Sequence, residues 1–220
     1  MNQSEAIEKK TMTTLLTERL RRDILQGRYR AGEHITVQRI TSAYQTSAIP
    51  AREAFSILCG ENLLDIVPYK GVIVREVNRK TVQDMYGVLR AMEVLIVESI
   101  LGHWTPELRE SVTAVNEQIK MIQTPEDVAE RFNDLNRAFH DPLEQFCTNA
   151  RAVQLRKQYH DYITIMTETG RRHSVRRVQE IYAEHCSIIS ALDSGNLPLI
   201  REAYIRHSIN AEQELLWQLS

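Results

Sequence analysis

The segment from Gln45 to Leu58, QTSAIPAREAFSIL, constrains the fold of this 220-residue chain more than any other. From Ser47 onward it has the character of a helix, yet a proline stands at position 50. A proline is tolerated in the first turn of a helix, because the N–H that it lacks would have no acceptor there. The segment therefore predicts a helix that starts at Ser47, with the Ser47 hydroxyl as its cap and Arg52 pointing outward.

The residues around this helix predict a winged helix-turn-helix. Apolar residues at helical spacing indicate two earlier helices, over residues 13–26 and 36–44, and a turn separates the second from the helix over 47–60. The period then changes, and β-branched residues flank Tyr69-Lys70-Gly71, as expected for two short strands joined by a tight turn. Three helices followed by a hairpin make up this fold.

The rest of the chain is predicted to be helical. Beyond Asn78 the strand signal disappears, and starts such as Thr105-Pro106 and Thr124-Pro125 punctuate long amphipathic segments. We therefore expect a mainly α protein, with a winged helix-turn-helix domain over 1–77 and an all-α six-helix bundle over 78–220. The expected helices of the bundle cover residues 79–103, 105–122, 125–147, 149–170, 174–194 and 197–219.

Composition excludes several classes of protein. No apolar run reaches the roughly 20 residues needed to cross a bilayer, and the first ten residues lack the apolar stretch of a signal peptide. A cytoplasmic protein with no membrane partner is therefore expected. The three cysteines are far apart, which favours neither disulfides nor a thiolate metal site. Residues 1–78 hold 11 Lys and Arg against 9 Asp and Glu, a small excess that favours a polyanionic partner at this end.

Between Ile24 and Val74 several residues form a wider pattern: Gly32, the run Pro50-Ala51-Arg52-Glu53-Ala54, Glu61 before Leu63-Leu64, and Pro68 with Gly71. With this pattern the chain resembles the DNA-binding domain of GntR-type bacterial transcription regulators. The resemblance implies a homodimer in which each winged helix reads half of a roughly palindromic operator. The DNA contacts that it implies are Gln38, Arg39, Ser47, Arg52, Lys70 and Gly71.

The chain also departs from that family pattern. Gln45 and Asn62 stand where the family usually has glycine, and Asn tolerates a left-handed backbone better than most residues. Ala48 replaces an arginine that usually contacts DNA. The loss of one base contact removes about 1 to 3 kcal/mol of discrimination, so we expect an unusual operator.

Three histidines lie on expected helices of the bundle: His140, His185 and His207. Asn136 precedes His140 by four residues, so both project from one helical face. From spacing alone, the three histidines are either packing and surface residues or metal ligands. The remaining histidines, His34, His103, His160 and His173, are expected to be surface or packing residues.

The contexts of the three histidines resemble the FCD (FadR C-terminal domain) branch of the same family, in which an acidic residue and three histidines bind a divalent metal beside an effector pocket. The resemblance implies a site made of Asn136, His140, His185 and His207. Because Asn136 replaces the usual aspartate, zinc or nickel is expected rather than a hard ion. Leu89 stands where the family usually has an arginine for an effector carboxylate, so the effector is left open.

These features favour a homodimeric, ligand-responsive transcription regulator, with repression as the commoner mode in the family. One alternative is a metal-dependent hydrolase or lyase that uses the three histidines around an open coordination position. Against it, the chain has no HExxH motif and no obvious glutamate base. A helical scaffold for protein partners is a third possibility, but it leaves the winged helix-turn-helix pattern without a purpose.

Overall fold

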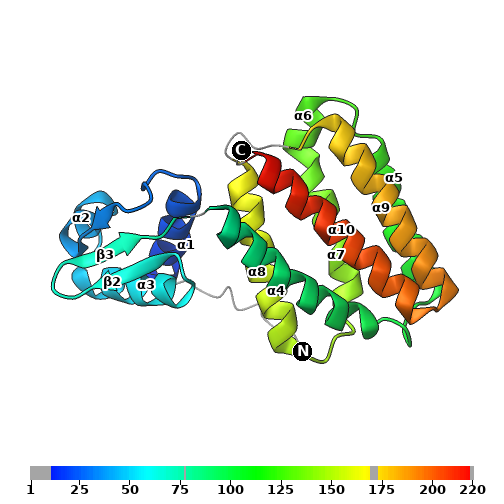
Figure 1. Cartoon of the computed structure of the whole chain (residues 1–220), viewed down its shortest axis with the longest axis horizontal. Helices are drawn as coiled ribbons and strands as arrows, with labels where there is room; N and C mark the ends of the chain where they lie inside the picture. The colour runs from blue at the N-terminus through cyan, green and yellow to red at the C-terminus, as the bar shows by residue number, and fades with distance from the viewer. Residues whose placement is uncertain (1–10, 77, 169–172, 219–220) are drawn as a thin grey trace, which may run out of the picture. The chain divides into compact units, whose positions relative to one another are not determined.

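The computed structural model of the chain describes residues 11–76, 78–168 and 173–218. The chain forms two compact units, with the division between positions 77 and 78 (Figure 1). The mainly α fold class, a winged helix-turn-helix followed by an all-helical unit, is confirmed.

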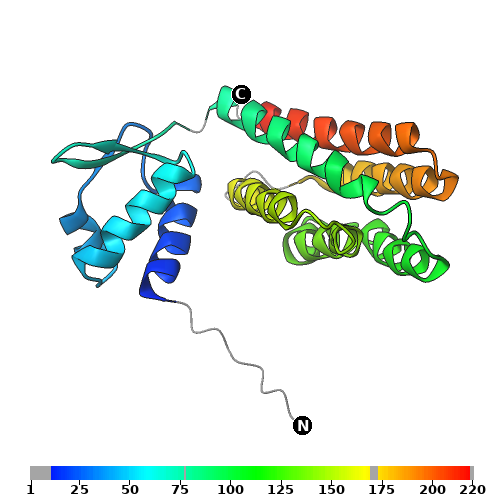
Figure 2. The same cartoon turned by 90° about the horizontal axis from the view of Figure 1, so that it is seen from below.

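The first unit contains three helices and a small sheet. The helices are α1 (Met12–Leu25), α2 (Val37–Ala43) and α3 (Ala48–Gly60), and the strands are β1 (His34–Ile35), β2 (Leu64–Val67) and β3 (Gly71–Val74). Helix α3 packs against α1, α2 and β2 (Figure 2). Its apolar face is buried in the core of the unit with Leu20, Ile35 and Ile40, all 0% exposed.

Strand β1 was not expected from the sequence. It pairs antiparallel with β3, which places β3 between β1 and β2. A two-residue strand has no periodicity of its own, so only its partner defines it. The pairing brings the Ile35 carbonyl so close to Gly71 that a Cβ there would lie 2.3 Å from the oxygen. Since Gly71 also has a φ of +106°, only glycine fits at this position.

Two positions where the resembling family has glycine adopt the left-handed backbone in this chain. Gln45, in the turn between α2 and α3, has a φ of 49°, and Asn62, just after α3, has a φ of 59°. The same local geometry is therefore kept with side chains present, at the strain cost that such residues incur.

The second unit is built from helices alone among its described residues. They are α4 (Arg79–Glu98), α5 (Pro106–Lys120), α6 (Pro125–Asp127), α7 (Asn133–Glu144), α8 (Ala150–Glu168), α9 (Val175–Ser194) and α10 (Leu197–Gln218). Helix α4 lies along α10 and α8, while α5 packs against α7 and α9 (Figures 1 and 2). None of these helices is both long and apolar enough to cross a bilayer.

The helix expected over 125–147 is interrupted. It begins as the short α6, passes through a π-helical turn over Val128–Phe132, and continues as α7 to Glu144. Val128 and Phe132 point into a hydrophobic cluster with residues of α5 and α9. A π turn inserts one extra residue into the helix, and such turns are frequent at functional sites. The turn lies directly before the segment that carries Asn136 and His140.

Replacing Gly71 with alanine should destabilise the first unit by about 2 kcal/mol or more, because the new Cβ would meet the Ile35 carbonyl in a backbone region unfavourable to alanine. The midpoint of urea unfolding, followed by circular dichroism, measures this effect. Gly60→Ala is the matched control, since a Cβ there would have nothing within 4 Å. An equal midpoint shift in both variants would contradict the explanation.

Candidate nucleic-acid interface and metal centre

Helix α3 presents a polar, uncovered face at its first turns. Ala51, Ala54, Phe55 and Leu58 are buried, whereas Arg52 is exposed. Within the described part of the chain, the Arg52 guanidinium makes no ion pair or hydrogen bond. An unpaired arginine on the outer face of this helix is available for a charged or hydrogen-bonding partner.

The expected cap of α3 is wrong in one respect. Ser47 does occupy the capping position, but its hydroxyl makes no capping hydrogen bond. In eight other described helices the side chain before the helix accepts from the backbone N–H three residues further on. The residue three positions after Ser47 is Pro50, which has no N–H to donate. The Ser47 side chain is exposed, and its hydroxyl makes no capping bond in the described structure.

The other expected DNA contacts lie in different surroundings. Gln38 is exposed on α2. Arg39 pairs with Glu33 at 2.6 Å and lies over the Tyr29 ring, 5.1 Å from its centroid. Hydrogen bonds from the Arg30 backbone and from Arg39 lower the pKa of Glu33. The Arg39 side chain is thus held in place before any partner binds.

The wing is the turn between β2 and β3. Lys70 is exposed, and its N–H donates to the Val67 carbonyl at 3.0 Å to close the turn. Gly71 lies against β1, as described above, and this close approach is the reason that the position requires glycine. Sequence reasoning gave no role to Tyr69, which is fully exposed with a φ of 64°. The only signal in the sequence that could have drawn attention to Tyr69 is the presence of an aromatic residue in the turn before Lys70-Gly71.

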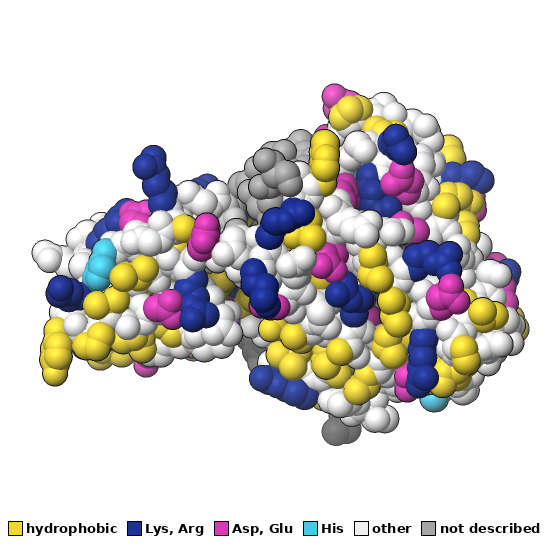
Figure 3. All heavy atoms as spheres, in the orientation of Figure 1, with side chains coloured by type: hydrophobic (Ala, Val, Ile, Leu, Met, Phe, Trp, Pro, Cys, Tyr) yellow, Lys and Arg dark blue, Asp and Glu magenta, His cyan; other side chains and the backbone are white. Residues whose placement is uncertain are grey.

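On the face shown in Figure 3, basic and acidic side chains are interspersed over both units, so charge does not mark an interface on this face. The candidate nucleic-acid surface is defined by individual side chains of α3 and the wing.

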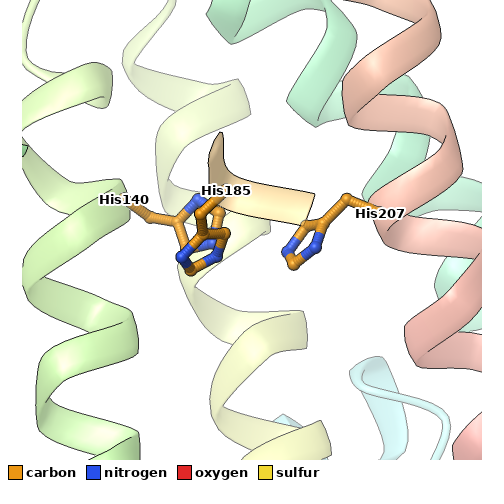
Figure 4. Close-up of side chains that lie close together, drawn as sticks. All are labelled: His140, His185 and His207. Atoms are coloured by element: carbon orange, nitrogen blue, oxygen red, sulfur yellow. The ribbon is translucent and has the colours of Figure 1, made fainter. Parts of the chain in front are cut away.

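The three histidines converge in the second unit. His140 comes from α7, His185 from α9 and His207 from α10 (Figure 4). One potential ligand nitrogen from each lies within 4.8 Å of the other two, and all three side chains are buried. Their ring centroids are 5.1 to 5.4 Å apart, which makes the cluster almost equilateral.

Neighbouring polar groups orient two of the rings. His185 Nδ1 lies 3.1 Å from the Asn116 amide oxygen, and His207 Nδ1 lies 2.7 Å from a Glu184 carboxylate oxygen. Because these acceptors hold a proton on Nδ1, the Nε2 lone pairs remain open. His185 Nε2 is buried and has no hydrogen-bond partner in the described structure. Outer contacts of this kind fix the ring orientation of metal-binding histidines.

The His140 and His185 imidazoles are neutral. Burial lowers the pKa of His140 well below its usual range, and the Arg156 charge adds to this effect. Burial likewise lowers the pKa of His185, with a contribution from His207. A neutral imidazole is the form that binds a metal ion.

Glu184 is the centre of a charged network between α9 and α10. It accepts hydrogen bonds from His207, from Arg177 at 2.6 Å and from Asn210 at 2.8 Å. Burial alone would raise its pKa, but the bonds from these partners outweigh that effect and lower the pKa to about 2. Arg177 continues the network to Glu214, at 3.1 Å. Neither Glu184 nor Asn116 was identified from the sequence, since neither belongs to a motif.

Asn136 lines the same cavity as His140 and His207. Its side-chain oxygen is buried without a hydrogen-bond partner in the described structure. A buried amide oxygen left unpaired is costly unless something else occupies its lone pairs. The cavity has a volume of about 70 Å³, enough for an ion and a small group. The donor set of three imidazole nitrogens and an amide oxygen fits a borderline divalent ion.

The cavity contains polar groups that sequence reasoning missed. His160 and His173, expected to be surface or packing residues, both line it. Burial lowers the pKa of His160 to about 3. Arg156 of α8 also lines the cavity, only 4% exposed and ion-paired with Glu144. Sequence spacing could not bring α8 to this cavity, because that placement depends on its packing against α4.

Leu89, at the position expected to hold an arginine in the resembling family, is buried and lines the cavity. The next residue, Arg90, pairs instead with Glu212 of α10. Burial raises the pKa of Glu93, another cavity residue, against the opposing effect of Arg156. The cavity therefore offers a ligand several hydrogen-bonding groups and the ion-paired Arg156. At position 89 of α4 it presents the apolar side chain of leucine.

Two family models match the chain. The model for bacterial regulatory proteins of the gntR family matches residues 14–74. The model for the FCD domain matches residues 84–210.

Curated proteins with similar sequences are transcription regulators. The HTH-type transcriptional repressor GlaR of Escherichia coli is 24% identical, over 76% of this chain and 77% of its own length. The gluconate operon transcriptional repressor of Bacillus subtilis is 22% identical, over 67% of this chain and 68% of its own length.

Solved structures share the fold. E. coli McbR/YncC superposes with a TM-score of 0.67 at 16% identity, covering 96% of this chain and all of that one. A putative GntR regulator from Rhodococcus sp. RHA1 gives 0.60 at 22% identity, covering 93% and 97%.

Replacing Arg177 with methionine should cost about 3 to 5 kcal/mol of unfolding free energy, because the buried carboxylates of Glu184 and Glu214 would lose their cation. Arg176→Met is the matched control. Arg176 is 89% exposed and pairs only with Glu180, so its loss should cost at most about 1 kcal/mol. Urea unfolding of both variants measures the difference, and similar costs would argue against the buried network.

Proposed function

This chain belongs to the gntR family of bacterial regulatory proteins and carries an FCD domain, and we propose that it is a homodimeric repressor whose operator binding responds to a small ligand at a metal-containing site. That it is a transcription regulator and not an enzyme follows from the matched families and from the similar curated proteins. The observation that carries the proposal is that one chain contains both an uncovered α3 face, in the first unit, and a buried three-histidine cluster, in the second.

The proposed DNA contacts centre on α3. Among the described residues the Arg52 guanidinium has no partner and the Ser47 hydroxyl makes no capping bond, so both can bond to base edges or phosphates without breaking an existing contact. In this fold the first turns of the recognition helix approach the bases. Gln38 and Arg39 of α2 would approach the backbone, and Lys70 would reach the minor groove. Gly71 shapes the wing through its close approach to β1 and stays, with Lys70, a proposed contact at the wing tip.

Homodimerisation is supported by an apolar surface on the second unit. Val88 and Leu95 of α4, and Ile205 and Ile209 of α10, are each 36 to 38% exposed. Helices α4 and α10 lie side by side, and Figure 3 shows hydrophobic side chains over this region. Two copies of the chain would allow two α3 helices to enter major grooves about one turn of DNA apart, ~34 Å.

The proposed metal ligands are His140, His185, His207 and Asn136. Three imidazole nitrogens and a neutral amide oxygen suit zinc or nickel better than they suit magnesium or calcium. A bound ion would supply an electrophilic position for an oxygen or nitrogen atom of a small ligand. Asn116 and Glu184 would fix the orientation of the His185 and His207 rings toward the ion through their hydrogen bonds.

The effector would occupy the cavity beside this cluster. Leu89 removes the cation expected on α4, and Arg156 is already paired with Glu144. These facts favour a ligand that is uncharged and hydrogen-bonding, or one that chelates the metal, over a simple acid. A coupling of about 1 to 3 kcal/mol between cavity and operator is enough for regulation.

Arg52→Ala should weaken operator binding by about 1 to 3 kcal/mol, or roughly 5- to 150-fold, while binding to random duplex DNA changes much less. Gel-shift titrations at one salt concentration measure both affinities. Arg19→Ala is the control, since Arg19 is an exposed arginine of α1. An equal loss on both kinds of DNA would mean that Arg52 contacts only phosphate.

Replacing both His185 and His207 with glutamine should abolish co-purifying metal, because two of three imidazole ligands are lost. Elemental analysis of the purified protein measures the content, with circular dichroism as a check on folding. His103→Gln is the control, because His103 is exposed and stacks on Phe146 away from the cluster. Undiminished metal in the double variant would refute the ligand assignment.

A further inference from the structure

Two exposed apolar residues begin α3 and have no role in the function proposed so far. Ile49 is 70% exposed, among the most exposed of the large hydrophobic side chains described, and Ala48 before it is also exposed. Single exposed apolar residues are common on protein surfaces. These two are notable for their place, on the first turn of a helix proposed to enter the major groove.

The helical geometry aims Ile49 directly away from the core. Successive residues of a helix are about 100° apart, and the buried residues Ala51, Ala54, Phe55 and Leu58 define the inner face. Ile49 lies opposite that face, in a stripe with Arg52 and Ser56. The core of its own unit therefore cannot cover it. Whatever Arg52 meets, Ile49 meets as well.

The chemistry of the major groove offers one fitting partner. Base edges there present hydrogen-bond donors and acceptors, and the single apolar group is the 5-methyl of thymine. An isoleucine pressed against a donor or acceptor would strip it of water without replacing the lost bond. Against a methyl group the same burial is favourable, by about 0.8 kcal/mol per methyl-sized group.

We infer that Ile49, assisted by Ala48, reads thymine methyl groups in each half of the operator. This inference rests on the proposed function, in which α3 is the recognition helix. It names the base that the first turn of α3 prefers, beside the contacts of Arg52 and Ser47. Thymine is favoured over cytosine at that step, because cytosine lacks the methyl and presents an amino donor instead.

The test removes single methyl groups from DNA. Wild-type protein first selects its preferred sequences from randomised duplexes. Each thymine of the best-bound duplex is then replaced, one at a time, by deoxyuridine, which differs only in lacking the methyl. At one or two positions in each half-site, deoxyuridine should weaken wild-type binding about three- to five-fold. For Ile49→Ala, the unmodified duplex should bind three- to five-fold more weakly, with no further loss from deoxyuridine at those positions.

Ile57→Ala is the matched control, since Ile57 is 42% exposed on the same helix, two turns beyond Ile49. It should keep the deoxyuridine sensitivity of the wild type. Thermal unfolding should show that both variants remain folded, as expected for exposed positions.

The outcomes separate this inference from the proposed function. Enrichment of a sequence whose binding ignores every deoxyuridine, or an Ile49→Ala variant that keeps the full sensitivity, overturns the thymine contact and leaves sequence-specific binding intact. A selection that enriches no sequence overturns the proposed function, and the inference with it.

Discussion

The second unit depends on the burial of three imidazoles on helices that are distant in sequence. His185 is fully buried on α9, stacked on Phe139 with ring centroids 3.7 Å apart. Burying such groups is tolerable only if their polar atoms find partners. Asn116 and Glu184 each satisfy one nitrogen, on His185 and His207 respectively, while His185 Nε2 is buried with no hydrogen-bond partner in the described structure. The fold thus satisfies only part of the bonding capacity of these rings, and the proposed metal ion would use the remainder.

The first unit also contains polar groups whose hydrogen bonding is not fully satisfied, and these lie at its surface. Its core is completed by ordinary apolar packing and by the tight approach of Gly71 to β1. On the outer face of α3, by contrast, Arg52 and Ser47 are left without partners in the described structure. In each unit, some of the groups proposed to act on other molecules have incomplete bonding in the described structure: Arg52 and Ser47 in the first, and His185 and Asn136 in the second.

Much of the fold could be predicted from the sequence because amphipathic periodicity and helix-start residues are local signals. Starts such as Thr105-Pro106 placed the helices within a few residues. Strand β1 and the π turn over Val128–Phe132 could not be found, since both exist through packing against distant segments. For the site, Asn136 and the three histidines were found by resemblance. Asn116, Glu184 and Arg156 carried no local signal. The Ser47 cap was an avoidable error, because Pro50 was visible in the sequence.

The proline at position 50 has a consequence for how such a regulator can diverge. At most helix starts the capping side chain contributes about 1 kcal/mol to stability, so its replacement is penalised whatever its effect on recognition. The Ser47 hydroxyl makes no such capping bond, and Pro50, three residues further on, has no N–H to donate, so replacing Ser47 removes no capping hydrogen bond. In the proposed recognition helix, a different side chain at position 47 would therefore alter the contact with DNA without removing a bond that stabilises the helix.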